Sequence, residues 1–166
     1  KLRAVIWPEA AHPYLFRGNE EEITYLGLLA PVGGYLISGV DRLDSDKRLY
    51  NSIIAVGYDA KLASVYDKHI LVPFGEYVPF SSIIPFVDKV AYGIYEFTPG
   101  AIYDKKLSDI ALKYYPLVCY EVIFPISQDL SQYEWLLNVT NDAWYGRSSG
   151  PYQHFAMSRF KATEYG

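Results

Sequence analysis

Short apolar runs alternate with amphipathic and polar stretches along the chain, a pattern typical of mixed α and β structure. Nearly continuous apolar runs predict buried strands at residues 2–7, 35–44, 51–59, 63–68, 114–121 and 135–142. Apolar positions at helical spacing, bounded by Pro, Gly or polar residues, predict helices at residues 19–34, 81–92, 126–133 and 150–166. The Pro- and Gly-bearing stretch between residues 69 and 80 predicts an ordered loop, and "EFTPG" predicts a turn. No repeat or linker interrupts the sequence pattern, so we expect a single domain over residues 1–166.

Composition narrows the class of protein. The chain has 166 residues, of which 51% are hydrophobic and 20% charged, and its net charge is −4. The sequence has no Lys/Arg cluster that could follow a phosphate backbone, which argues against a nucleic-acid partner. Seventeen Tyr and three Trp suit a Tyr-rich core and surface, and they also suit a membrane interface. Because the chain begins within a strand-like run without an initiator Met, we expect it to be a piece of a longer protein.

Three reactive side chains come at the ends of predicted strands. Glu9 follows "AVIWP", Lys68 follows "ASVYD" and Cys119 follows "YYPLV". A strand buried on both faces holds its last residue rigidly, which suits a catalytic side chain. A glutamate can take the proton of a thiol, and the resulting thiolate is a nucleophile. A lysine can stabilise both the thiolate and the oxyanion of a tetrahedral intermediate.

Each of these residues also has a structural interpretation. A lone cysteine is usually a small core residue, a glutamate at a strand end is usually exposed, and a lysine in a turn is usually solvated. A cysteine–histidine pair of the papain kind, using His69 or His154, is a further alternative. It is disfavoured because His69 adjoins the lysine, His154 lies on the final helix pattern, and Glu9 can serve as the base. Three His and one Cys without ligand spacing predict no metal site, and we expect no cofactor.

Five sequence blocks occur in a characteristic order. They are "WPEAAHP", "YDKHILVPFGEYVPF", "CYEVIFP", "NVTNDAWYG" and "GPYQH", and together they span essentially the whole chain. In this order they resemble the nitrilase-like domain of the apolipoprotein N-acyltransferase family, a branch of the carbon–nitrogen hydrolase superfamily. The resemblance implies an α/β fold of the nitrilase-like α-β-β-α sandwich type. Two sheets would pack face to face with helices outside, and the sandwich would be truncated at both ends.

The same resemblance implies roles for individual residues. Glu9 matches the general base, Lys68 the oxyanion-stabilising lysine and Cys119 the nucleophile. Supporting positions match Glu76, Tyr120 and Glu121, and pocket-wall positions match Asn141, Asp142 and Trp144.

The spacing of two glutamates bears on these supporting roles. Glu76 lies eight residues after Lys68, across the loop, so the chain can fold back and pair the two. Glu121 lies two residues after Cys119, so extended backbone would point both side chains to one face, whereas a turn after the thiol would separate them.

The implied activity is transfer of an acyl chain from a phospholipid, through a thioester on Cys119, to the α-amino group of the N-terminal diacylglyceryl-cysteine of an apolipoprotein. The implied place is the periplasmic face of the bacterial inner membrane. Residues 71–86 and 142–146 are the apolar loops expected to contact the membrane surface. Two alternatives remain: a soluble amidase of the nitrilase superfamily, in which water resolves the thioester, and a non-catalytic fragment or binding module.

Overall fold

Two β-sheets carry the chain in this computed structural model, which describes residues 2–79, 96–101 and 111–166. The first sheet has the strand order β1 (Ala4–Trp7), β2 (Tyr35–Leu43), β3 (Leu49–Gly57) and β4 (Leu62–Asp67). β1 runs parallel to β2, whereas β2, β3 and β4 pair antiparallel. The second sheet pairs β5 (Tyr114–Val118) with β6 (Trp135–Val139) in parallel.

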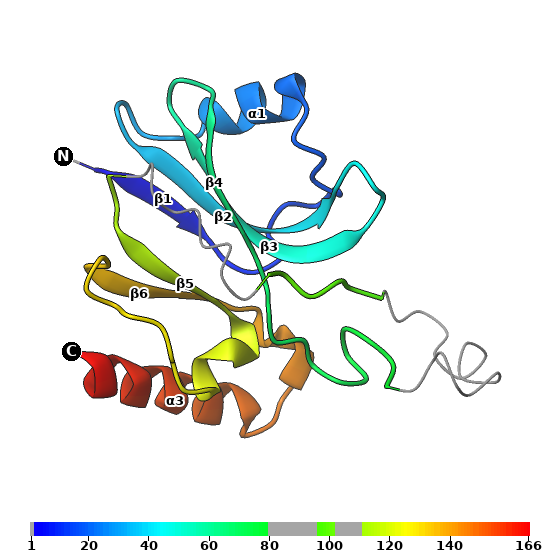
Figure 1. Ribbon diagram of the computed structural model, residues 1–166, viewed down its shortest axis with the longest axis vertical. Coiled ribbons are helices and arrows are strands. Elements are labelled where there is room, and N and C mark those ends of the chain that lie inside the picture. The colour runs from blue at the N-terminus through cyan, green and yellow to red at the C-terminus, as the bar shows by residue number, and fades with distance from the viewer. Residues whose placement is uncertain (1, 80–95, 102–110) are drawn as a thin grey trace.

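The two sheets enclose one apolar layer, and helices cover their outer faces (Figure 1). Buried residues from both sheets meet in this layer: Ile37, Ile53, Ala55 and Tyr66 from the first sheet, and Tyr114, Val118, Leu137 and Val139 from the second. A second cluster joins Leu26 of α1 (Glu20–Gly27) to the other face of the first sheet, where Val40 and Ile54 are buried. Helix α3 (Gly150–Tyr165) lies on the outer side of the second sheet (Figure 1). The predicted α/β class and its layer order are therefore confirmed.

Helix α1 is shorter than the stretch 19–34 predicted from the sequence. It begins with a capping box, in which the Asn19 side chain accepts from the backbone N–H of Glu22 and the Glu22 carboxylate accepts from the backbone N–H of Asn19. This exchange satisfies backbone donors that have no partner within the first helical turn. The helix ends at Gly27, and hydrogen-bonded turns occupy the residues between it and Pro31. Gly34, further along, lies close to the backbone carbonyl of Arg3.

The predicted helix at residues 126–133 is wrong. In the structure this stretch is irregular, because its polar groups bond locally and to other elements rather than along a helix. The Asp129 carboxylate accepts from both the backbone N–H and the hydroxyl of Ser131. The Gln128 side chain accepts from the hydroxyl of Tyr115. Such local side-chain bonds compete directly with helix formation. The helix predicted at residues 81–92 lies outside the described residues.

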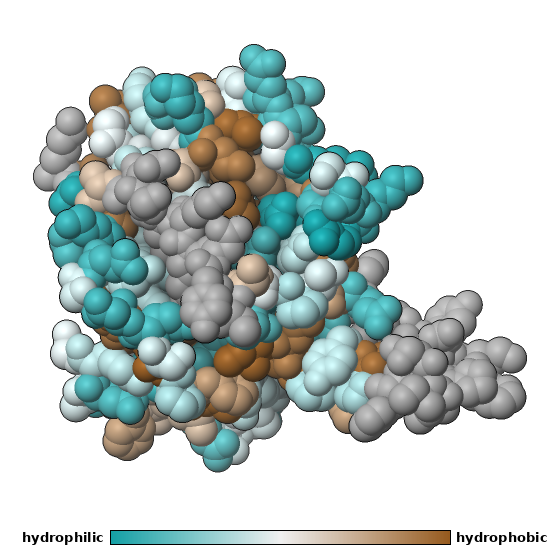
Figure 2. Space-filling model, viewed as in Figure 1, coloured by the Kyte–Doolittle hydropathy of each residue, from teal (hydrophilic) through white to brown (hydrophobic). Residues whose placement is uncertain are grey.

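Two short 3₁₀ turns complete the fold: η1 (Cys119–Ile123) follows β5, and η2 (Asp142–Tyr145) follows β6. Both lie at the carboxyl ends of their strands and both contact α3. Across the described ranges, no helix is long and apolar enough to cross a membrane. Figure 2 shows hydrophobic patches interleaved with hydrophilic ones on one face of the molecule, rather than one continuous apolar surface.

Candidate active site

Glu9 is held in a buried position just beyond the end of β1. Its side chain and backbone are only 6% exposed. One carboxylate oxygen accepts from Nδ2 of Asn51 at 2.7 Å, and the other accepts from the backbone N–H of Asn141 at 2.9 Å. β2 can approach this closely because position 39 is glycine: a Cβ there would lie 2.5 Å from the Cα of Glu9. The predicted strand-end glutamate is therefore buried and hydrogen-bonded rather than exposed.

Asn51, on β3, joins two carboxylates. Its Nδ2 donates to Oε1 of Glu9 at 2.7 Å and to Oε1 of Glu76 at 2.9 Å. Sequence analysis missed this residue. A signal existed, because Asn is disfavoured in strands and here it lies in a run that is otherwise almost wholly buried. A buried polar residue in such a strand needs partners, and those partners are site residues.

Lys68 and Glu76 form a buried ion pair. The Lys68 Nζ lies 2.8 Å from Oε2 of Glu76, and the lysine side chain is only 1% exposed. The same carboxylate oxygen accepts from the backbone N–H of Val72 at 2.8 Å, so the loop after β4 folds back as its spacing suggested. Two backbone bonds fix Lys68 itself, one to the carbonyl of Asn51 and one from the N–H of Gly100. The ammonium group is therefore held in one orientation.

Cys119 is the first residue after β5, and its backbone has a left-handed conformation with φ of +51°. A non-glycine residue in this region costs about 1–3 kcal/mol, and such strain persists only where the surroundings hold it. The strand is buried along its whole length, and the turn η1 begins at the thiol. The chain therefore changes direction sharply at the one cysteine and presents its side chain at the end of a rigid strand.

Burial and charge act together on the thiol. Burial chiefly, and then the negative charge of Glu9, raise the pKa of Cys119 to about 11. The side chain of Thr140 and the positive charge of Lys68 lower the pKa of this thiol, but by less. The charges of Glu9 and Lys68 thus act on the thiol in opposite directions. The resting thiol keeps its proton, so any reaction of the sulfur needs a base beside it.

A third acidic residue adds to the negative charge of this region. Burial, followed by the charges of Glu9 and Glu76, raises the pKa of Asp41 on β2 above its usual value. Lys68 offsets part of this negative charge, because its ammonium group forms an ion pair with Glu76. Because like charges close together cannot all be ionised cheaply, the carboxyl group of Asp41 favours retaining its proton.

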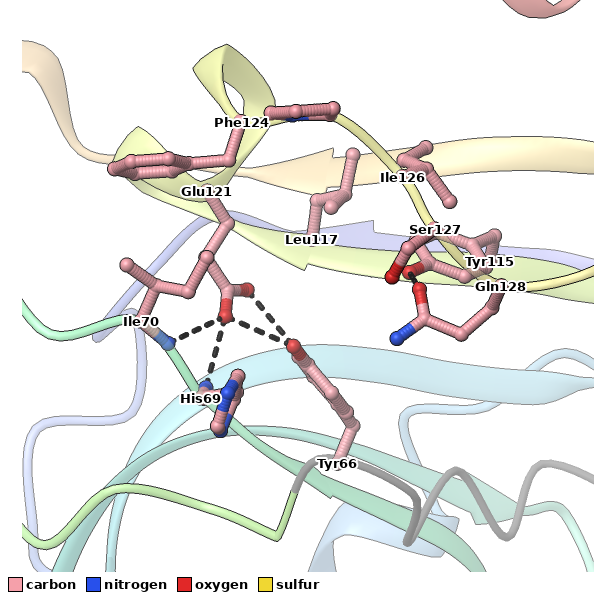
Figure 3. A pocket seen from close by; sticks show the side chains of 11 residues that line it. Tyr66, His69, Ile70, Tyr115, Leu117, Glu121, Phe124, Ile126, Ser127 and Gln128 are labelled. Carbon is pink, nitrogen blue, oxygen red and sulfur yellow. Dashed lines mark hydrogen bonds between the residues drawn. The ribbon is translucent and has the colours of Figure 1, made fainter.

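Glu121 points away from the thiol, as a turn after Cys119 would require. Its carboxylate accepts from the hydroxyl of Tyr66 at 2.9 Å and from the backbone N–H groups of His69, Ile70 and Val118 at 2.8, 3.1 and 2.9 Å. Figure 3 shows this carboxylate directed at Tyr66 and at the chain around His69. Glu121 therefore ties the turn that bears the cysteine to the segment that bears Lys68.

Replacing Glu121 by Gln tests this tie. In either orientation the amide NH₂ would face at least one N–H group, so we expect the free energy of unfolding to fall by about 3 kcal/mol. Glu134, which is exposed, supplies the matched control, and Glu134→Gln should change the value by less than about 0.5 kcal/mol. Urea titrations of the full-length chain would measure both variants, and equal effects would show that Glu121 does not tie the segments.

A cavity of about 190 Å³ opens beside Glu121 and is lined by Tyr66, His69, Leu117 and Gln128, among others (Figure 3). Glu9, Lys68 and Cys119 do not line it. This cavity is therefore separate from the thiol, and it does not mark the reactive site.

The remaining predicted residues surround η1 and η2. Tyr120 stacks on the ring of His154, with 5.9 Å between centroids. Asn141 caps η2 by accepting from the N–H of Ala143. Asp142 is bound to His154 at 2.8 Å, and Trp144 is 80% exposed. Within the described ranges, no three His, Cys, Asp or Glu side chains are grouped to hold a metal ion.

These features define a class of protein. Residues 3–166 match the carbon-nitrogen hydrolase family, and the chain belongs to it. The fold agrees with that of the carbon-nitrogen hydrolase superfamily protein XC1258 from Xanthomonas campestris, with a TM-score of 0.62 at 16% sequence identity. The match covers 96% of this chain and 58% of the XC1258 chain.

Within that family, the chain is similar to proteins named apolipoprotein N-acyltransferase. The one from Rhodopseudomonas palustris is 39% identical and the one from Rhizobium rhizogenes 36% identical, each over 98% of this chain. The chain spans about a third of the length of these relatives, 32% in both cases.

Proposed function

We propose that this chain is the catalytic part of an apolipoprotein N-acyltransferase and that Cys119 carries the acyl group. The observation that carries the proposal is the arrangement around the thiol: a buried carboxylate, Glu9, and a buried ammonium, Lys68, both act on Cys119 at a strained strand end. Two relatives that bear this enzyme's name, each more than 35% identical, supply the substrate class.

The first half of the reaction forms a thioester. Glu9 takes the thiol proton as the sulfur of Cys119 bonds to the carbonyl carbon of a phospholipid ester, and the carbonyl oxygen becomes an oxyanion. Lys68 stabilises this oxyanion. When the intermediate collapses, the glycerol oxygen leaves with the proton from Glu9. A lysophospholipid departs and the acyl group stays on the sulfur.

The second half transfers the acyl group to nitrogen. The α-amino group of a diacylglyceryl-cysteine attacks the thioester carbon and gives a proton to Glu9. The second oxyanion forms at the same carbonyl carbon, so Lys68 can stabilise it from the same position. Collapse breaks the carbon–sulfur bond, and the thiolate of Cys119 recovers the proton. The products are an amide and the free enzyme.

Asn51 and Glu76 support these two roles. Glu76 orients Lys68 through the 2.8 Å ion pair. Asn51 binds the carboxylates of Glu9 and Glu76 with the same amide nitrogen, so the base and the partner of the lysine keep a fixed separation. Reacting groups held in one geometry avoid the entropy cost of being brought together.

Contact with a lipid surface would deliver both substrates. Two large side chains of the apolar loops are exposed, which supports such contact: Phe74 is 70% exposed and Trp144 is 80% exposed. Residues 80–86 of the first loop lie outside the described residues. We place the enzyme at the bacterial inner membrane with this domain on the periplasmic face, where lipoprotein precursors present their N-termini.

One experiment separates acyl transfer from hydrolysis. The full-length chain is given a phospholipid with a labelled acyl chain and a peptide that begins with diacylglyceryl-cysteine. We expect label in an amide on the peptide and an equal amount of lysophospholipid, because the amine outcompetes water at the thioester. A peptide with an acetylated α-amino group is the matched control and should stay unlabelled. Release of free fatty acid alone, at the same rate with either peptide, would instead identify a hydrolase.

A further inference from the structure

His154 is buried next to the backbone of Cys119. It belongs to the first turns of α3 and is only 3% exposed. Its Nε2 lies 3.0 Å from the backbone carbonyl oxygen of Cys119, and its Nδ1 lies 2.8 Å from Oδ1 of Asp142. The ring is also packed between Tyr120, which stacks on it, and Tyr145, which meets it edge-on.

The partners fix how this imidazole bonds. A backbone carbonyl only accepts, so Nε2 carries a proton and donates to Cys119. Asp142 presents an oxygen to Nδ1, and the hydroxyl of Thr140 donates to that same oxygen at 3.0 Å. The histidine is thus oriented at one nitrogen by a carboxylate and directs the other nitrogen at the main chain of the nucleophile.

The Cys119 turn is held from two sides. Before the cysteine, the N–H of Val118 donates to the carboxylate of Glu121 at 2.9 Å. After the α-carbon, the carbonyl of Cys119 accepts from His154. A left-handed residue between these two bonds cannot relax to ordinary strand geometry without breaking one of them. The direction of the thiol therefore depends on the histidine as well as on the glutamate.

We infer that His154, oriented by Asp142, is a positioning residue that fixes the carbonyl of Cys119 and so aims its thiol at the substrate. This inference rests on the proposed role of Cys119 as nucleophile. It differs from a cysteine–histidine pair, because the imidazole bonds the backbone of the cysteine and Glu9 remains the base.

The test compares two replacements of His154 in the full-length chain. His154→Leu removes the hydrogen-bond donor to the Cys119 carbonyl and should lower kcat for acyl transfer by about 10- to 100-fold. KM should be nearly unchanged, because the substrate-binding surfaces are intact and only the orientation of the thiol is affected. His154→Gln offers an amide N–H to the same carbonyl and should recover a large part of kcat. The rate at which iodoacetamide alkylates Cys119, measured without any lipid, should follow the same order.

His12 supplies the matched control, since its Nδ1 also bonds a backbone carbonyl, that of Tyr14, at 2.8 Å. His12→Leu should leave kcat and alkylation unchanged. Wild-type kcat and alkylation in a folded His154→Leu protein would overturn the inference. If that variant does not fold, Asp142→Ala decides, and an unchanged kcat there overturns it equally. Transfer that survives Cys119→Ala would instead overturn the proposed function.

Discussion

Replacing Cys119 by Ala is expected to reduce acyl transfer by about four orders of magnitude or more, because the thioester can no longer form. The same change should abolish trapping of a labelled acyl chain on the protein. In the wild type the trapped label should be released by hydroxylamine at neutral pH, as thioesters are. Mass spectrometry of the labelled protein would place the acyl group on the peptide that contains residue 119.

The stability of this variant separates chemistry from folding. The thiol is small and buried, so Cys119→Ala should lower the free energy of unfolding by only about 1 kcal/mol. It removes no hydrogen bond of the turn, because the turn is held through backbone groups and through Glu121 and His154. Appreciable transfer by the folded variant would contradict the assignment of Cys119 as nucleophile.

Opposite changes in thiol reactivity are expected when the two charges beside the cysteine are removed singly. The carboxylate of Glu9 raises the pKa of Cys119, so Glu9→Gln should lower that pKa and speed alkylation of the thiol at pH 8. The charge of Lys68 lowers the same pKa, so Lys68→Met should raise it and slow alkylation. Each unit of pKa change alters the thiolate fraction about tenfold when the pH is well below the pKa.

Acyl transfer should respond differently, since each variant lacks one of the two groups to which we assign a catalytic role. We expect a decrease of about 10²- to 10⁴-fold without the base and about 10²- to 10³-fold without the lysine. Faster alkylation together with slower transfer in Glu9→Gln is the combination that distinguishes a base from a structural carboxylate. Slower alkylation in Glu9→Gln would contradict the proposed electrostatics.

Folding of the lysine variant needs its own control. Lys68→Met leaves Glu76 charged and unpaired in a buried site, a loss of about 3–5 kcal/mol in the free energy of unfolding. Adding Glu76→Gln removes the unpaired charge, and the double variant should recover part of that stability without recovering transfer, because the new amide NH₂ still faces the N–H donor of Asn51 or of Val72. Thermal unfolding and transfer rates of the single and double variants would check this.

The sequence predicts the positions of the reactive side chains because the apolar runs show approximately where the strands end. Continuous apolar runs gave β1 and β4 to within one residue at the ends that bear Glu9 and Lys68, whereas β5 ends at Val118, three residues before its predicted end, because the turn η1 begins at Cys119. The chain pairs Lys68 with Glu76, as their spacing allowed. The catalytic roles themselves came from the family resemblance and stay proposals, because geometry alone does not establish chemistry.

What sequence reasoning missed depends on contacts between distant segments. Asn51 reads as one polar residue in a strand, and only the packing of three segments makes it a bridge between carboxylates. The sequence offers His154 as an alternative acid–base partner of Cys119, yet its Nε2 bonds the backbone carbonyl of that residue. The stretch 126–133 has helical spacing, but bonds to Tyr115 and Tyr165, which lie far away in the sequence, hold it irregular.

The thiol and its two charged neighbours come from different layers of the sandwich. Cys119 extends from the second sheet, whereas Glu9 and Lys68 extend from the first, and the Tyr66–Glu121 bond crosses between them. Separation of the layers would therefore disassemble the site. We expect activity to be lost on heating no later than secondary structure, because one buried cluster joins the two sheets.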